Sequence, residues 1–183
     1  MKKGFFAIAG MFLLFSCNDA AKDNDGNDDF RMQAERNTSH NKEIYRAIET
    51  GDVSKLDSFI APDVIDHAGN MGKDIVGLDS LKVHLSKIHT YFDNLKTEVL
   101  SEATSIDGQY HFSMHRMTGK AKQNPWGMPV GMEFDDKGID VVKIKDGKAA
   151  EHWSFSSQED INEMMAAMSG GNKPRASKDS ANR

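Results

Sequence analysis

The chain is poor in cysteine and in long apolar runs, and both shortages limit what it can be. Its 183 residues include one cysteine, Cys17, so no disulfide can form within a single molecule. The apolar run from Phe5 to Phe15 is too short to cross a bilayer as a helix. The sequence therefore predicts neither a disulfide-stapled domain nor a mature transmembrane helix.

Several motifs that mark particular chemistries are also missing. The histidines do not fall at the short, fixed spacings of zinc motifs, and the cysteine lies in the N-terminal segment. The sequence has no glycine-rich phosphate loop and no Gly-x-Ser-x-Gly elbow. The formal net charge of −5 argues against nucleic acid, whose binders carry clustered Lys and Arg. We therefore expect no metal, no cofactor and no nucleic-acid partner.

The N-terminal residues have the pattern of an export signal. Met1-Lys2-Lys3 supplies positive charge, the apolar run follows, and Leu14-Phe15-Ser16-Cys17 resembles a bacterial lipobox. This pattern predicts a signal peptide over residues 1–16, a lipid on Cys17 and a place in the bacterial cell envelope. The alternative is an ordinary secretory signal that happens to end at a cysteine.

Polar segments flank the central part of the chain. Residues 17–36 are mostly acidic and polar, and such a composition predicts a disordered tether. Residues 169–183 are rich in Gly, Ser, Asn and Lys without periodicity, and we expect a disordered tail. Between them, residues 37–168 are expected to form one domain of ordinary size.

Within this domain, helical spacing comes first and strand patterns follow. The pattern predicts helices around 44–50, 53–61, 78–91 and 158–168, and strands at 64–67, 96–106, 109–118 and on both sides of a hairpin at 146–147. Helices followed by an antiparallel meander indicate an α+β fold in which helices cover one face of a curved sheet.

The most informative stretch is that hairpin, "GIDVVKIKDGKAAEHWSF". Asp146-Gly147 favours a tight two-residue turn, which would pair Ile144 with Ala149 and Asp140 with Trp153. Regular alternation then gives an inward face, made of Asp140, Val142, Ile144, Ala149, Glu151, Trp153 and Phe155. His152 would point away from this face.

Two carboxylates on an apolar face suggest acid–base chemistry. Burial raises the pKa of a carboxyl group, so Asp140 and Glu151 in different surroundings could act as an acid and a base. The alternative is that Glu151 curls to the sheet edge while Asp140 caps a nearby loop.

The segments "IETGDVSKLDSFIAPDVIDHAG", "GLDSLKVHLSKI" and "GIDVVKIKDGKAAEHW" resemble the SnoaL-like polyketide cyclases, which belong to the nuclear transport factor 2-like superfamily. The resemblance implies a cone-shaped α+β domain, with N-terminal helices packed on a strongly curved antiparallel or mixed sheet that encloses a pocket, and commonly a homodimer. It implies that Asp140 is the general acid/base. Ala121 stands where the family often has a histidine.

Further residues are candidates for the pocket. His67 could bind a substrate carbonyl or move a proton, because imidazole titrates near neutral pH; otherwise it is a surface histidine. His115 shares a strand face with His111 and Ser113, and that face either lines the cavity or meets water. The residues predicted to bind substrate are Trp153, Tyr45, Trp126, Met128, Met132 and His115.

Three functions remain open from the sequence. The first is an enzyme that transfers a proton on a small hydrophobic carbonyl compound, with Asp140, His67 and Glu151 as catalytic groups. The second is a binding module without catalysis, held at the membrane surface by a lipid on Cys17. The third is a structural dimerisation domain whose cavity has collapsed.

Overall fold

The computed structural model describes residues 24–70, 73–123 and 127–168. In chain order the elements are α1 (Asn24–Thr50), η1 (Leu56–Ser58), β1 (Ile60–Asn70), β2 (Lys73–Val76), α2 (Leu78–Ile88), η2 (His89–Tyr91), β3 (Phe92–Thr104), β4 (Tyr110–Ala121), β5 (Glu133–Lys145), β6 (Lys148–Ser156) and α3 (Gln158–Met168). None of the helices in these ranges is long and apolar enough to span a bilayer.

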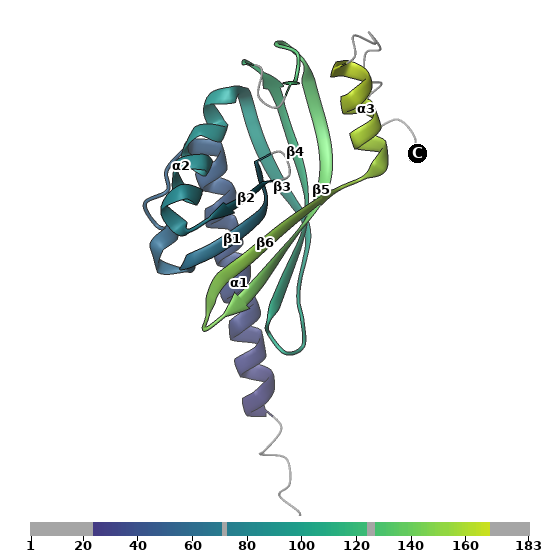
Figure 1. Cartoon of the computed structure of the whole chain (residues 1–183). Helices are drawn as coiled ribbons and strands as arrows, with labels where there is room; N and C mark the ends of the chain where they lie inside the picture. The colour runs from purple at the N-terminus through teal and green to yellow at the C-terminus, as the bar shows by residue number, and fades with distance from the viewer. Residues whose placement is uncertain (1–23, 71–72, 124–126, 169–183) are drawn as a thin grey trace, which may run out of the picture.

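The strands form one curved, open sheet in the order β2-β1-β6-β5-β4-β3 (Figure 1). β1 and β6 run parallel, and the other neighbouring strands run antiparallel. Helices α1 and α2 cover one face of the sheet, whereas α3 lies on the other side of the strands (Figure 1). This arrangement confirms the predicted α+β fold with helices packed on a curved mixed sheet.

The hydrophobic core fills the space between the two covering helices and the sheet. Leu81 and Leu85 of α2 pack with Ala47 of α1, because helical spacing places them on one face. The complete buried cluster is Ala47, Leu56, Phe59, Ile60, Val64, Leu78, Leu81, Leu85, Ile88, Phe92, Ala121, Met128 and Phe134.

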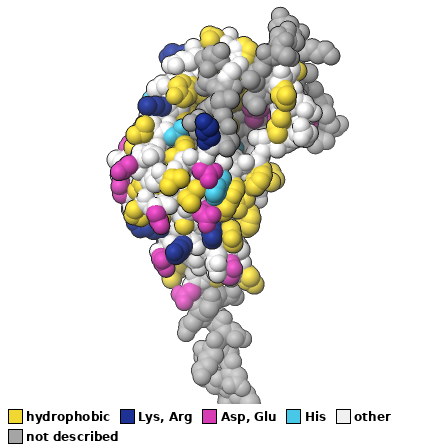
Figure 2. Space-filling model, viewed as in Figure 1, with side chains coloured by type: hydrophobic (Ala, Val, Ile, Leu, Met, Phe, Trp, Pro, Cys, Tyr) yellow, Lys and Arg dark blue, Asp and Glu magenta, His cyan; other side chains and the backbone are white. Residues whose placement is uncertain are grey.

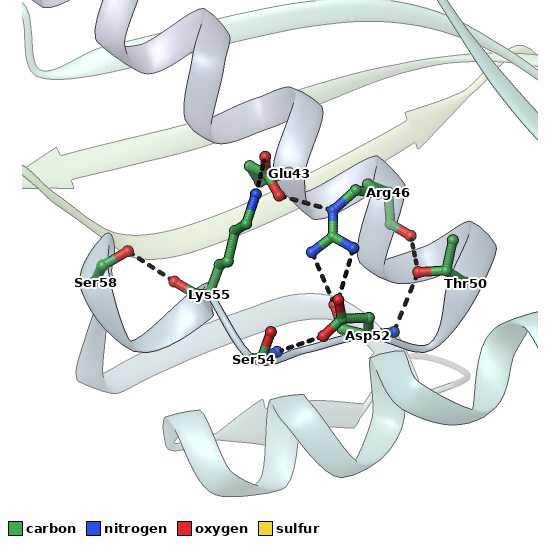
Figure 3. A network of polar contacts seen from close by, with 7 residues as sticks. All are labelled: Glu43, Arg46, Thr50, Asp52, Ser54, Lys55 and Ser58. Carbon is green, nitrogen blue, oxygen red and sulfur yellow. Dashed lines mark hydrogen bonds and ion pairs between the residues drawn. The ribbon is translucent and has the colours of Figure 1, made fainter.

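The C-terminal end of α1 is fixed by its backbone and by exposed charges. Gly51 ends the helix at φ +76°, and a Cβ there would collide with the His89 ring. Arg46 donates to Glu43 and to Asp52, at 2.8 Å in each case, and Lys55 donates to Glu43 (Figure 3). These contacts tie α1 to the loop that leads to η1.

Two local predictions differ from the observed elements. α1 begins at Asn24, so residues 24–36 of the segment expected to be a tether are helical, and the Gln33 side chain donates to the Gly108 carbonyl. The helix predicted over 53–61 is wrong, because only Leu56–Ser58 are helical and Ile60 begins a strand. Ile60 pairs with Ala149, about ninety residues away, and this pairing outweighs the local spacing.

The predicted hairpin turn is confirmed, but its register is not. Asp146 and Gly147 have φ angles of 52° and 75°, and Ile144 pairs with Ala149 as expected. Lys143 then pairs with Glu151, so Ala150 is an extra residue that forms a β-bulge. Beyond the bulge every β6 side chain faces opposite to the prediction.

Candidate active site

A pocket lies between α1, α2 and the covered face of the sheet. Its empty volume is about 560 Å³, part of which is open to solvent. Most of its lining is aliphatic, and the polar groups are few. The lining residues are Asn41, Ile44, Tyr45, Ile48, Ile60, Val64, Asp66, Leu81, Leu85, Asp140, Val142, Ala149 and His152.

Asp140 lies at the centre of the polar groups in this pocket. It is 9% exposed, and its predicted inward orientation is confirmed. The Tyr45 hydroxyl donates to Asp140 Oδ2 at 2.8 Å, and His115 Nδ1 lies 3.3 Å from the same oxygen. Ser113 Oγ lies 3.2 Å from the Tyr45 hydroxyl. Side chains from α1, β4 and β5 thus converge on one buried carboxylate.

His152 connects Asp140 to a second carboxylate. Its Nδ1 lies 2.8 Å from Asp66 Oδ1, and its Nε2 lies 3.4 Å from Asp140 Oδ1. Asp66 Oδ1 also accepts a hydrogen bond from the Ala68 amide. Since both ring nitrogens face carboxylate oxygens, the doubly protonated imidazolium fits this position best.

The pKa shifts follow from these contacts. Burial lowers the pKa of His152, but its hydrogen bonds to Asp140 and Asp66, and their charges, outweigh burial and raise that pKa to about 9. Burial raises the pKa of Asp140, but His152 and His115 offset it, and the net direction is downward. Burial and the charge of Asp140 raise the pKa of Tyr45. At neutral pH the cluster therefore holds an ionised Asp140, an imidazolium and a neutral phenol.

The bulge changes which predicted residues join this site. Glu151 and Trp153 were expected beside Asp140, and that placement is wrong because they lie on the opposite face of β6. His152 was expected to point away, and it instead contacts Asp140. His115 faces the interior at 7% exposure, and the hydroxyl of Tyr45 lies 3.2 Å from its Nδ1.

His67, the other predicted catalytic partner, also lies outside the pocket. Its Nδ1 is 3.1 Å from Asp74, its Nε2 is 3.5 Å from Glu151, and its ring stacks on Trp153 at 5.0 Å. Lys143 donates to Glu151 at 2.6 Å. We call these five residues the outer cluster. Asp140 therefore has neither His67 nor Glu151 beside it, and the catalytic role predicted for either would have to operate on this other face.

The remaining predicted residues are not among the pocket-lining side chains. Met128 is part of the hydrophobic core and Met132 packs against that core, so neither lines the pocket of Asp140. Trp126 lies outside the described residues, as does Cys17. Within the described parts of the chain, no group of three His, Cys, Asp or Glu could hold a metal ion.

Comparison with known proteins identifies the family. The sequence model of the SnoaL-like polyketide cyclases matches residues 39–163. The chain belongs to this family. No curated protein matches the sequence.

Solved structures of this family share the fold. A proposed SnoaL-like polyketide cyclase from Jannaschia sp. CCS1 is 16% identical, with a TM-score of 0.61 over 77% of this chain and 95% of its own. TsrD from Streptomyces laurentii is 18% identical, with a TM-score of 0.62 over 73% and 96%. IdmH from Streptomyces antibioticus, a proposed polyketide cyclase, is 20% identical, with a TM-score of 0.56 over 73% and 97%. At such identities the likeness shows the fold alone.

The sequence reasoning missed Asp66 and His152 as members of the site. Asp66 accepts a hydrogen bond from the Ala68 amide, as a turn-capping residue does, but its carboxylate also contacts His152. One signal could have revealed the register. Lys143 opposite Glu151 is a favourable cross-strand charge pair, which the regular hairpin would have replaced with Val142 opposite Glu151.

Proposed function

We propose that this SnoaL-like domain is a cyclase- or isomerase-type enzyme that transfers a proton on a small hydrophobic carbonyl compound. The observation that supports it is one buried, ionised carboxylate, Asp140, with an imidazolium, His152, in a pocket whose other walls are mainly aliphatic. Apolar walls favour an apolar substrate. A deprotonated carboxylate beside a protonated imidazolium can serve as the base and the acid of a proton transfer.

The roles follow from the contacts. Asp140 takes a proton from the carbon next to the carbonyl, and the electron pair moves onto the carbonyl oxygen. His152 Nε2–H stabilises that oxygen, since its contact to Asp140 is long at 3.4 Å and can turn toward a substrate. Tyr45 holds Asp140 in place through its 2.8 Å hydrogen bond. Return of the proton to another carbon completes an isomerisation. In a ring closure the carbanion instead attacks a second carbonyl of the same compound, and the proton held by Asp140 passes to the alkoxide oxygen that forms.

The test is the exchange of α-hydrogens for deuterium in a simple ketone. Methyl octyl ketone in D₂O is followed by mass spectrometry with the wild-type chain, Asp140→Asn and Asp146→Asn. Loss of the base is expected to lower the exchange rate by about 10²–10⁴-fold. Asp146→Asn makes the same chemical change at the exposed turn of the same hairpin and is expected to leave the rate unchanged. Equal rates in all three proteins would contradict the proposal.

A specific observation favours a second candidate, a binding module without catalysis. Both oxygens of Asp140 already face hydrogen-bond donors, so the hydrogen-bonding capacity of the carboxylate is satisfied. Such a satisfied buried network also occurs where the role is structural. Ala121, which replaces the histidine expected from the family resemblance, is buried in the core. This function predicts that methyl octyl ketone raises the melting temperature without any α-hydrogen exchange.

We also propose that a lipid on Cys17 holds the domain at the surface of a bacterial membrane. The support is the lipobox-like sequence, Leu14 to Cys17, after a short apolar run. Mass spectrometry of the protein from bacterial membranes would show a diacylglyceryl mass on Cys17, and Cys17→Ser would move the protein to the soluble fraction. An unmodified Cys17 would contradict the anchor.

A homodimer is the third element of the proposal. The uncovered sheet face exposes large apolar side chains, among them Phe112 at 38%, Met114 at 44% and Phe155 at 58%. In the space-filling view, hydrophobic side chains gather beside a histidine and acidic groups (Figure 2). Phe112→Lys is expected to shift the sedimentation coefficient to that of a monomer, whereas Ile106→Lys, on an exposed turn, is not.

A further inference from the structure

Asn37 is a buried polar residue of α1 whose side-chain nitrogen has no hydrogen-bond partner among the described residues. The residue is 3% exposed, and its Nδ2 makes no hydrogen bond with any described residue. An unpaired buried amide is costly, so native proteins seldom keep one without a reason. The surroundings of Asn37 suggest that reason.

Asn37 lines a second chamber that continues the pocket of Asp140. Its empty volume is about 300 Å³, open solvent included. It shares Asn41, Ile44, Val142 and Ala149 with the first pocket, so the two chambers adjoin. The members found in this chamber alone are Asn37, His40, Phe59, His111 and Ile144.

The two chambers follow one stripe of α1. Asn37, Asn41, Ile44 and Ile48 recur at intervals of three and four residues, which places them on one face of the helix. From Asn37 to Tyr45 the helix rises about 12 Å. On the opposite wall, the four residue steps from Asp140 to Ile144 span about 13 Å of strand. The cavity thus has the Asp140 carboxylate at one end and the Asn37 carboxamide at the other, with Asn41, Ile44, Val142 and Ala149 between them.

The far end of this cavity suits a neutral group better than an anion. Asn41 donates to Glu102 at 2.8 Å and His111 lies 3.3 Å from the same carboxylate oxygen, so both already face a negative charge. A ligand carboxylate would be repelled by Glu102. A hydroxyl both donates and accepts, as the Asn37 carboxamide does, and can therefore pair with it.

We propose that the cavity binds an elongated neutral compound that carries a carbonyl at the Asp140 end and a hydroxyl at the Asn37 end. Asn37 is then a specificity residue rather than a catalytic one. The inference rests on the proposed function for the position of the carbonyl. It adds a second polar group on the ligand, the hydroxyl, and the distance between the carbonyl and that hydroxyl.

The experiment compares two probes, methyl octyl ketone and the same ketone with a hydroxyl at the far end of its chain. Dissociation constants are measured by calorimetry for the full chain, for Asn37→Leu and for Asn162→Leu. Leucine has nearly the shape of asparagine, so the fold is expected to persist. Asn162 is exposed on α3 and provides the matched control.

In the wild-type chain and in Asn162→Leu, the hydroxyl is expected to tighten binding roughly fivefold. In Asn37→Leu this gain is expected to vanish while the plain ketone binds as before. If the plain ketone binds but the hydroxyl brings no gain, or if the gain survives in Asn37→Leu, the inference is overturned and the proposed function stands. If neither ketone binds the wild-type chain, the proposed function fails, and the inference fails with it.

Discussion

Two histidines on neighbouring strands have similar partners but different surroundings. His152 on β6 lies between Asp66 and Asp140, and His67 on β1 lies between Asp74 and Glu151. The side chains of the carboxylates around His152 are 7% and 12% exposed, whereas the side chains of those around His67 are 51% and 28% exposed. The same residue types thus form a buried cluster on one sheet face and a solvated one on the other.

The difference teaches that burial, and not residue composition, determines how much a charge cluster contributes to the free energy of unfolding. Water screens the outer cluster, where Lys143 also neutralises Glu151. In the pocket the two carboxylates depend on His152, because little water reaches them. Variants of the two histidines should therefore differ strongly, and the following predictions run from the largest effect to the smallest.

Replacement of His152 by alanine is expected to have the largest effect. It leaves Asp66 and Asp140 buried without their shared cation, which is expected to lower the free energy of unfolding by about 3 kcal/mol. Urea denaturation at pH 7 measures this change. A loss of stability no greater than that in His67→Ala would show that the buried cluster contributes no more to folding than the outer cluster does.

The stability of the protein is expected to depend on pH through the same residue. The pKa of His152 rises from 6.5 in the unfolded chain to about 9 in the fold, so its contribution is complete below pH 6.5. As pH rises through 9 the contribution is lost, and the free energy of unfolding should fall by about 3 kcal/mol. Denaturation across pH 6 to 10 tests this, and the fall should shrink in His152→Ala. A flat profile in the wild-type chain would contradict the raised pKa.

Tyr45→Phe removes one donor from the buried cluster while the ring remains. The free energy of unfolding is expected to fall by about 1–2 kcal/mol, and the pKa of Asp140 should rise because its carboxylate loses a hydrogen bond. NMR titration of carbon-labelled aspartate would measure the second effect. Tyr110→Phe, which removes a hydroxyl from the uncovered sheet face, is the control and should leave the pKa of Asp140 unchanged.

His67→Ala is expected to have the smallest effect. Glu151 keeps its 2.6 Å contact with Lys143, and Asp74 is half exposed to water. The free energy of unfolding should change by no more than the error of the urea measurement. A large loss would mean that the stacking of His67 on Trp153 is a structural element of β1 and β6.

The sequence predicted those parts of the fold that depend on local preferences. The turn at Asp146-Gly147, the helix at Leu78–Ile88 and the closing helix at Gln158–Met168 were all predictable, because turn chemistry and periodicity are local. Asp140 was also placed correctly, since the bulge lies on the partner strand β6 and the side chains of β5 alternate regularly. His152 was misplaced because regular pairing from the tight turn sets it opposite Val141, whereas the bulge pairs it with Val142.

The amino-acid sequence by itself therefore determined the α+β class, the family and the inward carboxylate of this protein. Only the tertiary structure decided what surrounds that carboxylate. The bulge at Ala150 turns His152 inward, and the parallel pairing of β1 with β6 brings Asp66 to meet it. Both depend on contacts between segments far apart in the chain, and a one-residue change of register reverses the facing of every side chain that follows.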